Sequence, residues 1–243
     1  MRMRKKKNGE ARLAAVSYLL AEKPAEPIDP CGEDDREIYL EVGAGKGGFA
    51  CEMARIHPGA RFYALEKVSD CIVLAAEKAA ARASERPGDN LRFIIGGADS
   101  LCEWFAPGSV DKIFLNFSDP WSKKGYAKRR LTYRKYLYIY FSLLKDGGEL
   151  RFKTDNRGLF DFSLEELTAM GLRPDIVTYD LHTSEWNDGN IMTEYEENFS
   201  SQGIPINMLS VKKPEGYLPG NFFVPDPSSH FPMRSGNSEK QNQ

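Results

Sequence analysis

From residue 36 onward the chain alternates short apolar segments with segments of helical spacing. Strands that alternate with helices form a parallel sheet with helices on both faces. The order βαβαβαβαβ predicts a doubly wound α/β fold. The expected strands are 37–42, 61–66, 91–95, 110–116 and 149–154, the expected helices are 49–56, 68–84, 100–105, 131–144 and 158–171, and closing strands with a long loop are expected within 173–213.

The remaining segments set the expected domain boundaries. Residues 10–21 have helical spacing, and 23–35 contain three prolines and several acids, which is typical of a surface loop. We therefore expect an N-terminal basic arm, helix and linker over 1–35, one catalytic domain over 36–213, and a flexible C-terminal tail over 214–243.

Composition excludes several classes of protein. The net charge of −2 gives no global basic excess, so any case for nucleic-acid binding depends on local charge. The four cysteines form no C-x-x-C pair and no group with histidine, so neither a metal site nor a disulfide framework is expected. No apolar run reaches the roughly 18 residues of a membrane span, and none follows the basic N-terminus as in a signal peptide. We expect a cytoplasmic protein.

A glycine-rich segment follows the first expected strand. Residues 39–48 read Y-L-E-V-G-A-G-K-G-G, and they are followed by an expected helix. Such a turn lets the backbone approach a ligand closely and aims helix N–H groups at it, although a merely tight turn explains the glycines equally well. The Walker A spacing is absent.

Two acids make the glycine segment more informative. Glu66 ends the second expected strand, where a carboxylate commonly accepts both hydroxyls of an adenosine ribose, in NAD and S-adenosylmethionine (SAM) alike. Glu41 lies two residues before Gly43, where it would repel a pyrophosphate but attract the sulfonium and ammonium groups of SAM. This favours SAM over NAD. The alternative for Glu41 is a strand-end acid paired with a nearby lysine or arginine.

Further acids occur at the same predicted sheet edge. Asp119 ends the fourth strand, which flanks the switch point where open α/β sheets bind ligands. Asp155 ends the fifth strand, although an acid there often caps a helix, here one beginning near Gly158. The segment 190–197 could reach the cleft from a loop or simply begin a helix.

A basic stretch lies beside the predicted cleft. Residues 121–145 contain no acid, and tyrosines interrupt the positive charges. Phosphate contact and base stacking require this mixture, whereas the alternative is a solvated helix face. The cations are Lys123, Lys124, Lys128, Arg129, Arg130, Arg134, Lys135 and Lys145.

Together these motifs resemble the bacterial TrmB-type tRNA (guanine-N7)-methyltransferases over residues 36–213. The specific segments are F-S-D-P-W at 117–121, K-R-R-L at 128–131, F-K-T-D-N-R-G-L-F at 152–160 and N-I-M-T-E-Y-E-E at 190–197. The resemblance implies a class I SAM-dependent methyltransferase, Rossmann-like, with a doubly wound, mostly parallel seven-stranded sheet. It also implies SAM as cofactor and guanosine 46 of the tRNA variable loop as target. The protein is expected to be a monomer or a homodimer.

The resemblance also implies roles for individual residues. Asp119 would be the catalytic carboxylate and would bind cofactor as well. The cofactor-binding residues would be Glu41, Gly43, Gly45, Glu66, Gly97, Ala98 and Asp119. The substrate-binding residues would be Lys123, Asp155, Thr193, Glu194, Tyr195 and Glu196.

The chain departs from the family pattern at three places. Gly97 stands where the family often has an acid or Asn near the adenine, so either backbone N–H groups or Asp99 must serve there. Ser122 replaces the usual proline, and Gly125 with Tyr126 replaces basic or polar residues.

Guanine N7 carries an in-plane lone pair and no proton, so its methylation needs alignment and a carboxylate to offset the growing positive charge rather than a general base. Asp155 and Glu196 are candidates to accept hydrogen bonds from the N1–H and N2–H₂ groups of an extruded guanine. A SAM-dependent methyltransferase of another substrate class, or an inactive RNA-binding module, remains open on the sequence.

Overall fold

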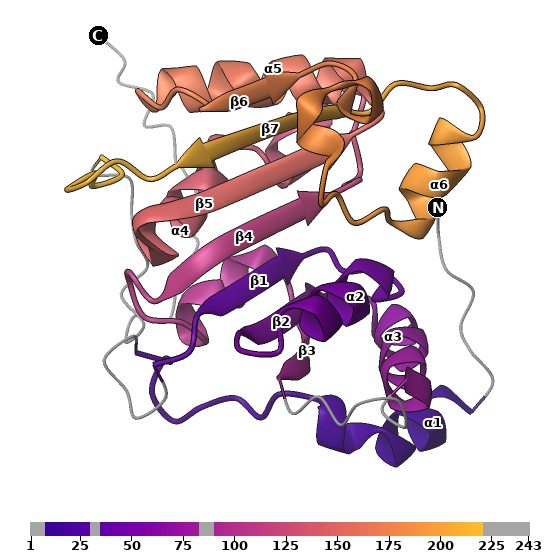
Figure 1. The fold of residues 1–243 in the computed structure, drawn as a ribbon. Coiled ribbons are helices and arrows are strands. Elements are labelled where there is room, and N and C mark those ends of the chain that lie inside the picture. The colour runs from indigo at the N-terminus through magenta and orange to yellow at the C-terminus, as the bar shows by residue number, and fades with distance from the viewer. Residues whose placement is uncertain (1–7, 30–34, 83–89, 221–243) are drawn as a thin grey trace, which may run out of the picture.

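The computed structural model describes residues 8–29, 35–82 and 90–220 (Figure 1). The charged start of the expected arm and the end of the expected tail lie outside the described residues. The expected helix at 10–21 is shorter than its spacing suggested. It consists of α1 (Gly9–Ala15) and a 3-10 turn (Ser17–Leu19), after which Leu20 forms a bridge with Phe93 at the sheet edge.

One seven-stranded sheet organises the described chain, in the order β3-β2-β1-β4-β5-β7-β6. Every pairing among β1 to β5 is parallel, whereas β7 runs antiparallel to both of its neighbours. This confirms the predicted doubly wound, mostly parallel sheet. The strands are β1 (Ile38–Val42), β2 (Arg61–Glu66), β3 (Leu91–Ile95), β4 (Val110–Asn116), β5 (Leu144–Thr154), β6 (Ile176–Thr178) and β7 (Asn207–Lys212).

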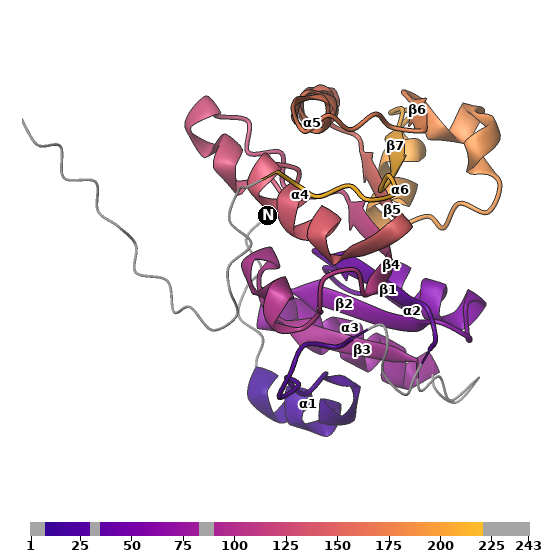
Figure 2. The same ribbon diagram turned by 90° about the vertical axis from the view of Figure 1, so that its left-hand side faces the viewer.

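Helices cover both faces of this sheet, as the near-continuous burial of its central strands requires. α2 (Gly48–Ile56) and α3 (Ser69–Arg82) pack against one face, and α4 (Arg134–Leu143) and α5 (Arg157–Ala169) pack against the other (Figure 2). Each face therefore has its own apolar core.

Two local predictions differ from the structure in detail. Residues 100–105 were expected to be helical, and a 3-10 helix occupies Ala98–Glu103. β5 was expected to begin at Glu149, but it begins at Leu144 and shifts register against β4 between Val110 and Lys112. The Gly147–Gly148 pair accommodates this irregularity, because Gly147 has φ +78° and glycine tolerates a bulge.

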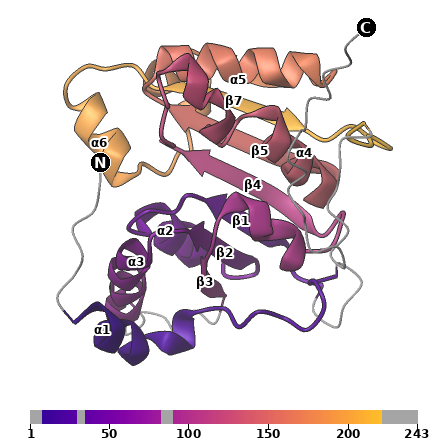
Figure 3. The same cartoon turned by 180° about the vertical axis from the view of Figure 1, so that it is seen from behind.

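The strand order places β1 beside β4, so the topological switch lies between them. Ligands bind outside the carboxyl ends of such strands. A short helix, α6 (Glu194–Ser200), stands at this edge, toward which β1 and β4 point (Figures 1 and 3). Among the described residues, no helix has both the length and the apolar character to cross a bilayer.

Candidate active site

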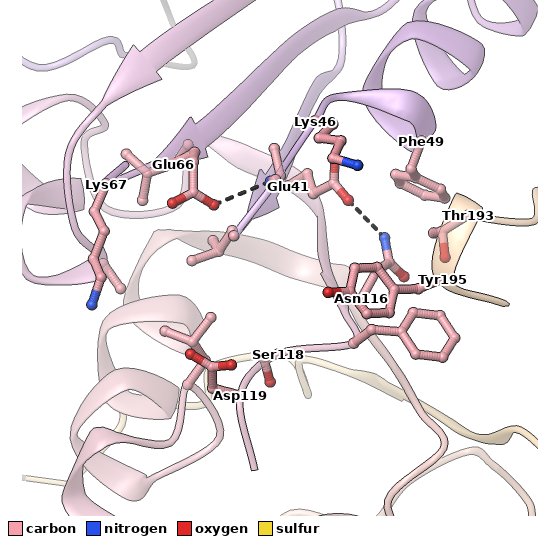
Figure 4. A pocket seen from close by; sticks show the side chains of 18 of the residues that line it. Glu41, Lys46, Phe49, Glu66, Lys67, Asn116, Ser118, Asp119, Thr193 and Tyr195 are labelled. Carbon is pink, nitrogen blue, oxygen red and sulfur yellow. Dashed lines mark hydrogen bonds between the residues drawn. The ribbon is translucent and has the colours of Figure 1, made fainter. Parts of the chain in front are cut away.

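A cavity of about 290 Å³ opens at the switch point, outside the carboxyl ends of β1, β2 and β4. Figure 4 shows Glu41 and Glu66 on one side of it and Asp119 on the other. Thr193 and Tyr195 close a third side from α6. Two strand acids, Glu41 and Glu66, one acid from the loop after β4 and an aromatic edge thus line one space, as the sequence predicted for Glu41 and Asp119.

The glycine turn shapes the cavity floor. Gly43 has φ +86°, and its N–H donates to the Leu65 carbonyl oxygen over 2.8 Å. Gly47 has φ +71°, and a Cβ there would stand 2.6 Å from the Cβ of Ala75. Side chains are excluded at both positions, because L-residues rarely adopt this backbone and α3 packs closely. α2 begins directly after this turn, so its first residue lies beside the cavity.

Glu66 is fixed by two backbone donors. Gly45 N–H donates to its Oε2 over 3.1 Å, and Val68 N–H donates to its Oε1 over 2.9 Å. A carboxylate has about four acceptor positions, so two remain for a ligand. This geometry suits the two hydroxyls of a ribose.

The Glu41 carboxyl group is buried, with 2% of the residue exposed. Asn116 Nδ2 donates to its Oε1 over 2.9 Å, while its Oε2 is buried and has no hydrogen-bond partner among the described residues. Burial raises the pKa of Glu41 to about 7, against the lowering effects of Asn116 and the Lys153 charge. The direct Lys or Arg partner considered from the sequence is therefore replaced by a neutral amide, and Asn116 carried no sequence signal.

We expect Glu41→Gln to change the pH dependence of stability. The folded chain keeps the Glu41 proton up to about pH 7, whereas the unfolded chain releases it near the ordinary glutamate pKa of 4.5. The free energy of unfolding of the unmodified protein therefore falls as pH rises between these values, by about 3 kcal/mol. Gln has no such loss. Urea unfolding measures the free energy of unfolding of Glu41→Gln minus that of the unmodified protein. This difference should be about 2–3 kcal/mol larger at pH 8 than at pH 5. An equal difference at both pH values would contradict the raised pKa of Glu41.

The loop after β4 places Asp119 in the cavity. Its side chain is exposed, and within the described residues neither a hydrogen bond nor an ion pair engages its carboxylate. Lys123 follows on the exposed surface, outside the cavity lining. Asp119 is thus available to a ligand.

The end of β3 bears on the choice between backbone N–H groups and Asp99 as the adenine contact. Gly96, Gly97 and Ala98 line the cavity. The Asp99 carboxylate instead forms an ion pair with Lys135 and lies 3.4 Å from the Tyr136 hydroxyl. Among the alternatives considered from the sequence, the cavity lining favours the backbone of Gly96, Gly97 and Ala98.

The 193–196 segment divides into two parts. Thr193, Glu194 and Tyr195 line the cavity, and Thr193 also caps α6 in a capping box with Glu196, so both alternatives from the sequence hold. Glu194 forms ion pairs with Lys78 and, over 3.9 Å, with Lys46. Tyr195 is 55% exposed, and its ring stacks on Phe117 with the centroids 6.4 Å apart.

Glu196 does not have the position expected of a substrate-binding residue. It is fully buried, and its Oε2 accepts from Lys153 Nζ over 2.6 Å. Its Oε1 accepts from Asn190 Nδ2 over 2.7 Å and lies 2.9 Å from His182 Nε2. Burial acts to raise the pKa of Glu196, but Lys153, His182 and Asn190 lower it overall. Because these partners occupy the carboxylate, it secures α6 and cannot accept hydrogen bonds from a guanine.

Asp155 lies at the end of β5 but outside the cavity lining, half-buried. It does not cap the following helix. That role belongs to Asn156, whose Oδ1 accepts from Leu159 N–H over 2.8 Å. Asp155 remains a candidate for substrate contact from the rim.

The basic stretch is not one uniform surface. Three of its cations neutralise acids, since Arg134 pairs with Glu166, Lys135 with Asp99 and Lys145 with Asp111. Arg130 is half-buried and donates to backbone carbonyls. The exposed cations without an acid partner among the described residues are Lys123, Lys124, Lys128 and Arg129.

The sheet order and the cavity define the class. The chain is a SAM-dependent methyltransferase of class I, with the Rossmann-like fold expected from the sequence. Solved methyltransferases whose sequences are less than 25% identical to this chain share its fold. A 16S rRNA methyltransferase, KamB, is 13% identical with a TM-score of 0.56, covering 81% of this chain and 99% of that one. TrmN from Thermus thermophilus is 20% identical with a TM-score of 0.52, covering 84% of this chain and 48% of that one.

Sequence comparison narrows the class to a family. A family model described as putative methyltransferase matches residues 35–209. A tRNA (guanine-N(7)-)-methyltransferase of Lachnoclostridium phytofermentans is 48% identical over 176 residues, which is 72% of this chain and 80% of that protein. The chain belongs to the TrmB-type tRNA (guanine-N7)-methyltransferase family, which confirms the resemblance drawn from the motifs.

Proposed function

We propose that this protein transfers a methyl group from SAM to N7 of guanosine 46 in the variable loop of tRNA, in the cytoplasm. The observation that carries the proposal is the unpaired Asp119 carboxylate, facing the same cavity as Glu41 and Glu66. The 48% identical relative named as a tRNA (guanine-N(7)-)-methyltransferase supports this choice of substrate.

The cavity fits SAM by its chemistry. Glu66 offers fixed acceptors for ribose hydroxyls, and the Gly43–Gly47 turn leaves backbone exposed to the ligand. The unpartnered Oε2 of Glu41 suits a cationic group, and ionisation of this buried acid becomes favourable when a positive charge enters. When bound, SAM supplies an electrophilic methyl group on a cationic sulfonium.

Asp119 provides what N7 chemistry requires of the protein. N7 has a free lone pair, so no proton has to be removed before attack. Positive charge develops on the base as the methyl group is transferred, and a preorganised carboxylate stabilises that charge. We assign this stabilisation to Asp119.

The rim residues suit an extruded base. Tyr195 presents an exposed ring at the cavity edge, and unpaired bases stack on such rings. We propose that Thr193, Tyr195, Asp155 and Lys123 contact the target nucleotide and its surroundings. Glu194, held by Lys78 and Lys46, forms the adjoining wall.

The test is methyl transfer from labelled SAM to competing acceptors. The purified protein should label unmodified tRNA, and nuclease digestion should release the label as 7-methylguanosine. A ribosomal RNA fragment and a mixture of bacterial proteins, offered at equal mass, should remain unlabelled. Label in either acceptor, with none in tRNA, would favour a methyltransferase of another substrate class.

The unpaired cations predict a specific salt dependence. Replacing Lys123, Lys124 and Lys128 together by Ala should weaken tRNA binding and lower the slope of log affinity against log salt by about 2–3, because each lost phosphate contact removes about 0.7–0.9. Filter binding between 50 and 300 mM salt measures this slope. The matched control, Lys135→Ala with Lys145→Ala, removes cations already paired with acids and should retain it. An equal slope in both variants would refute the RNA-binding surface.

A further inference from the structure

The loop that carries Asp119 has a strained backbone at both ends. Phe117 has φ +50° and Trp121 has φ +42°, and neither is glycine. The left-handed conformation is unfavourable for residues with a Cβ, and it persists only where the surroundings enforce it. The contacts that hold these two residues therefore also determine where Asp119 stands.

The first end of the loop is held by neighbouring elements. Phe117 N–H donates to the Lys153 carbonyl oxygen of β5 over 2.9 Å. The Phe117 ring stacks on Tyr195 of α6. This end is thus fixed by the sheet and by the wall of the cavity.

At the second end, one side chain donates hydrogen bonds to the loop backbone. Arg130 Nε donates to the Pro120 carbonyl oxygen over 2.9 Å, and Arg130 Nη2 donates to the Trp121 carbonyl oxygen over 3.2 Å. These are the two residues directly after Asp119. The centre of the guanidinium lies 4.3 Å from the centroid of the Phe162 ring, which belongs to α5. Arg130 thereby connects the loop to a long helix of the core.

The neighbouring Arg129 has different surroundings. Its guanidinium is exposed and lies over the rings of Trp121 and Tyr126, at 4.9 Å and 4.7 Å from their centroids. It also lines the cavity, whereas Arg130 does not. Of these two consecutive arginines, Arg129 therefore faces the cavity, and Arg130 faces the backbone of the loop.

We infer that Arg130 is a positioning residue, which fixes the Asp119 carboxylate by donating hydrogen bonds to the carbonyl oxygens of the next two residues, Pro120 and Trp121. The inference rests on the proposed function, in which Asp119 stabilises charge on the methylated base. A guanidinium presents N–H groups from separate nitrogens in a rigid planar fork that meets both carbonyls at once, whereas the three N–H groups of a lysine ammonium rotate about one nitrogen on a flexible stem. Because a displacement of about 1 Å can cost about 100-fold in rate, this fork is important for catalysis although it touches no reactant.

The test compares Arg130→Lys with Arg129→Gln. Arg130→Lys keeps the charge but loses the fork, so the single-turnover methylation rate at saturating SAM and tRNA should fall about 10- to 100-fold. Its SAM affinity and its tRNA affinity should stay within about twofold of those of the unmodified protein, and its salt slope should be unchanged. Arg129→Gln should instead weaken tRNA binding and flatten the salt dependence.

A spectroscopic signal reports the loop directly. In protein containing 5-fluorotryptophan, ¹⁹F resonances are assigned by Trp→Phe substitution. Arg130→Lys should shift the resonance of Trp121 and leave those of Trp104 and Trp186 in place. If Arg130→Lys does not fold, Phe162→Leu removes the ring beneath the guanidinium, and it should lower the rate several-fold and shift the same resonance.

Two outcomes overturn the inference. One is a variant rate within about twofold of the unmodified rate with an unshifted Trp121 resonance. The other is a rate loss matched by weaker tRNA binding and a lower salt slope, which would make Arg130 a phosphate contact like its neighbours. If the unmodified protein methylates no guanine N7, the proposed function fails, but the Trp121 resonance still tests whether Arg130 holds the loop.

Discussion

Asp119→Asn is expected to lower the single-turnover methylation rate by about 10²–10³, with SAM and tRNA affinities changed far less. Asn keeps the shape and one acceptor oxygen, but it cannot offset the positive charge that grows on guanine. Because no ion pair among the described residues engages the Asp119 carboxylate, its replacement should disturb little else. Rapid-quench measurement with saturating tRNA and SAM separates the chemical step from binding.

The matched control for this variant is Asp99→Asn. Asp99 also follows a strand at the same sheet edge, but it turns away from the cavity to Lys135. Its replacement should leave the rate within about twofold. A rate for Asp119→Asn near that of the unmodified protein would mean that Asp119 is only a strand-end residue.

Lys153→Met is expected to lower the free energy of unfolding by about 3–5 kcal/mol, since it leaves the Glu196 carboxylate buried without its cation. The Lys153 side chain is 3% exposed, and its ammonium also donates to Asn190 Oδ1 and to the Ile191 carbonyl oxygen, each over 2.9 Å. Urea unfolding at pH 7 measures the loss. The double variant Lys153→Met with Glu196→Met should recover much of it, because the buried charge is removed as well.

The exposed pair of Lys78 and Glu194 supplies the comparison for Lys153. It connects α3 to the same helix α6, but Glu194 is 51% exposed. Lys78→Met should cost at most about 1 kcal/mol, because solvent screens such pairs. If Lys153→Met were no more destabilising than Lys78→Met, the buried pair would not be what fixes α6.

The sequence was sufficient to predict where Glu41, Glu66 and Asp119 meet. Each lies at or just after the carboxyl end of an apolar strand, and parallel strands end at one edge, so local patterns determined a tertiary arrangement. The bounds of β2, β3 and β4 were predicted correctly for the same reason. Strong local signals and the rules of α/β topology agree here.

The contacts that fix the site had no local signal. Glu196 meets Lys153 across 43 residues, and Arg134 meets Glu166 across 32, so neither pairing follows from spacing along a helix or strand. Phe117 and Trp121 adopt the left-handed backbone conformation, which in a sequence is usually indicated by glycine or asparagine and not by an aromatic residue. Arg130 could not be separated from Arg129 by charge alone, because the difference lies in what each guanidinium touches.

The most direct test of the central claim uses two tRNA substrates that differ at one atom. One has guanosine at position 46, and the other has 7-deazaguanosine there, in which a C–H group replaces N7. The account predicts that labelled SAM transfers its methyl group to the first tRNA, that borohydride and aniline cleave the product at position 46, and that the second tRNA stays unlabelled. Equal labelling of both tRNAs, or cleavage at another guanosine, would contradict methylation of N7 at guanosine 46.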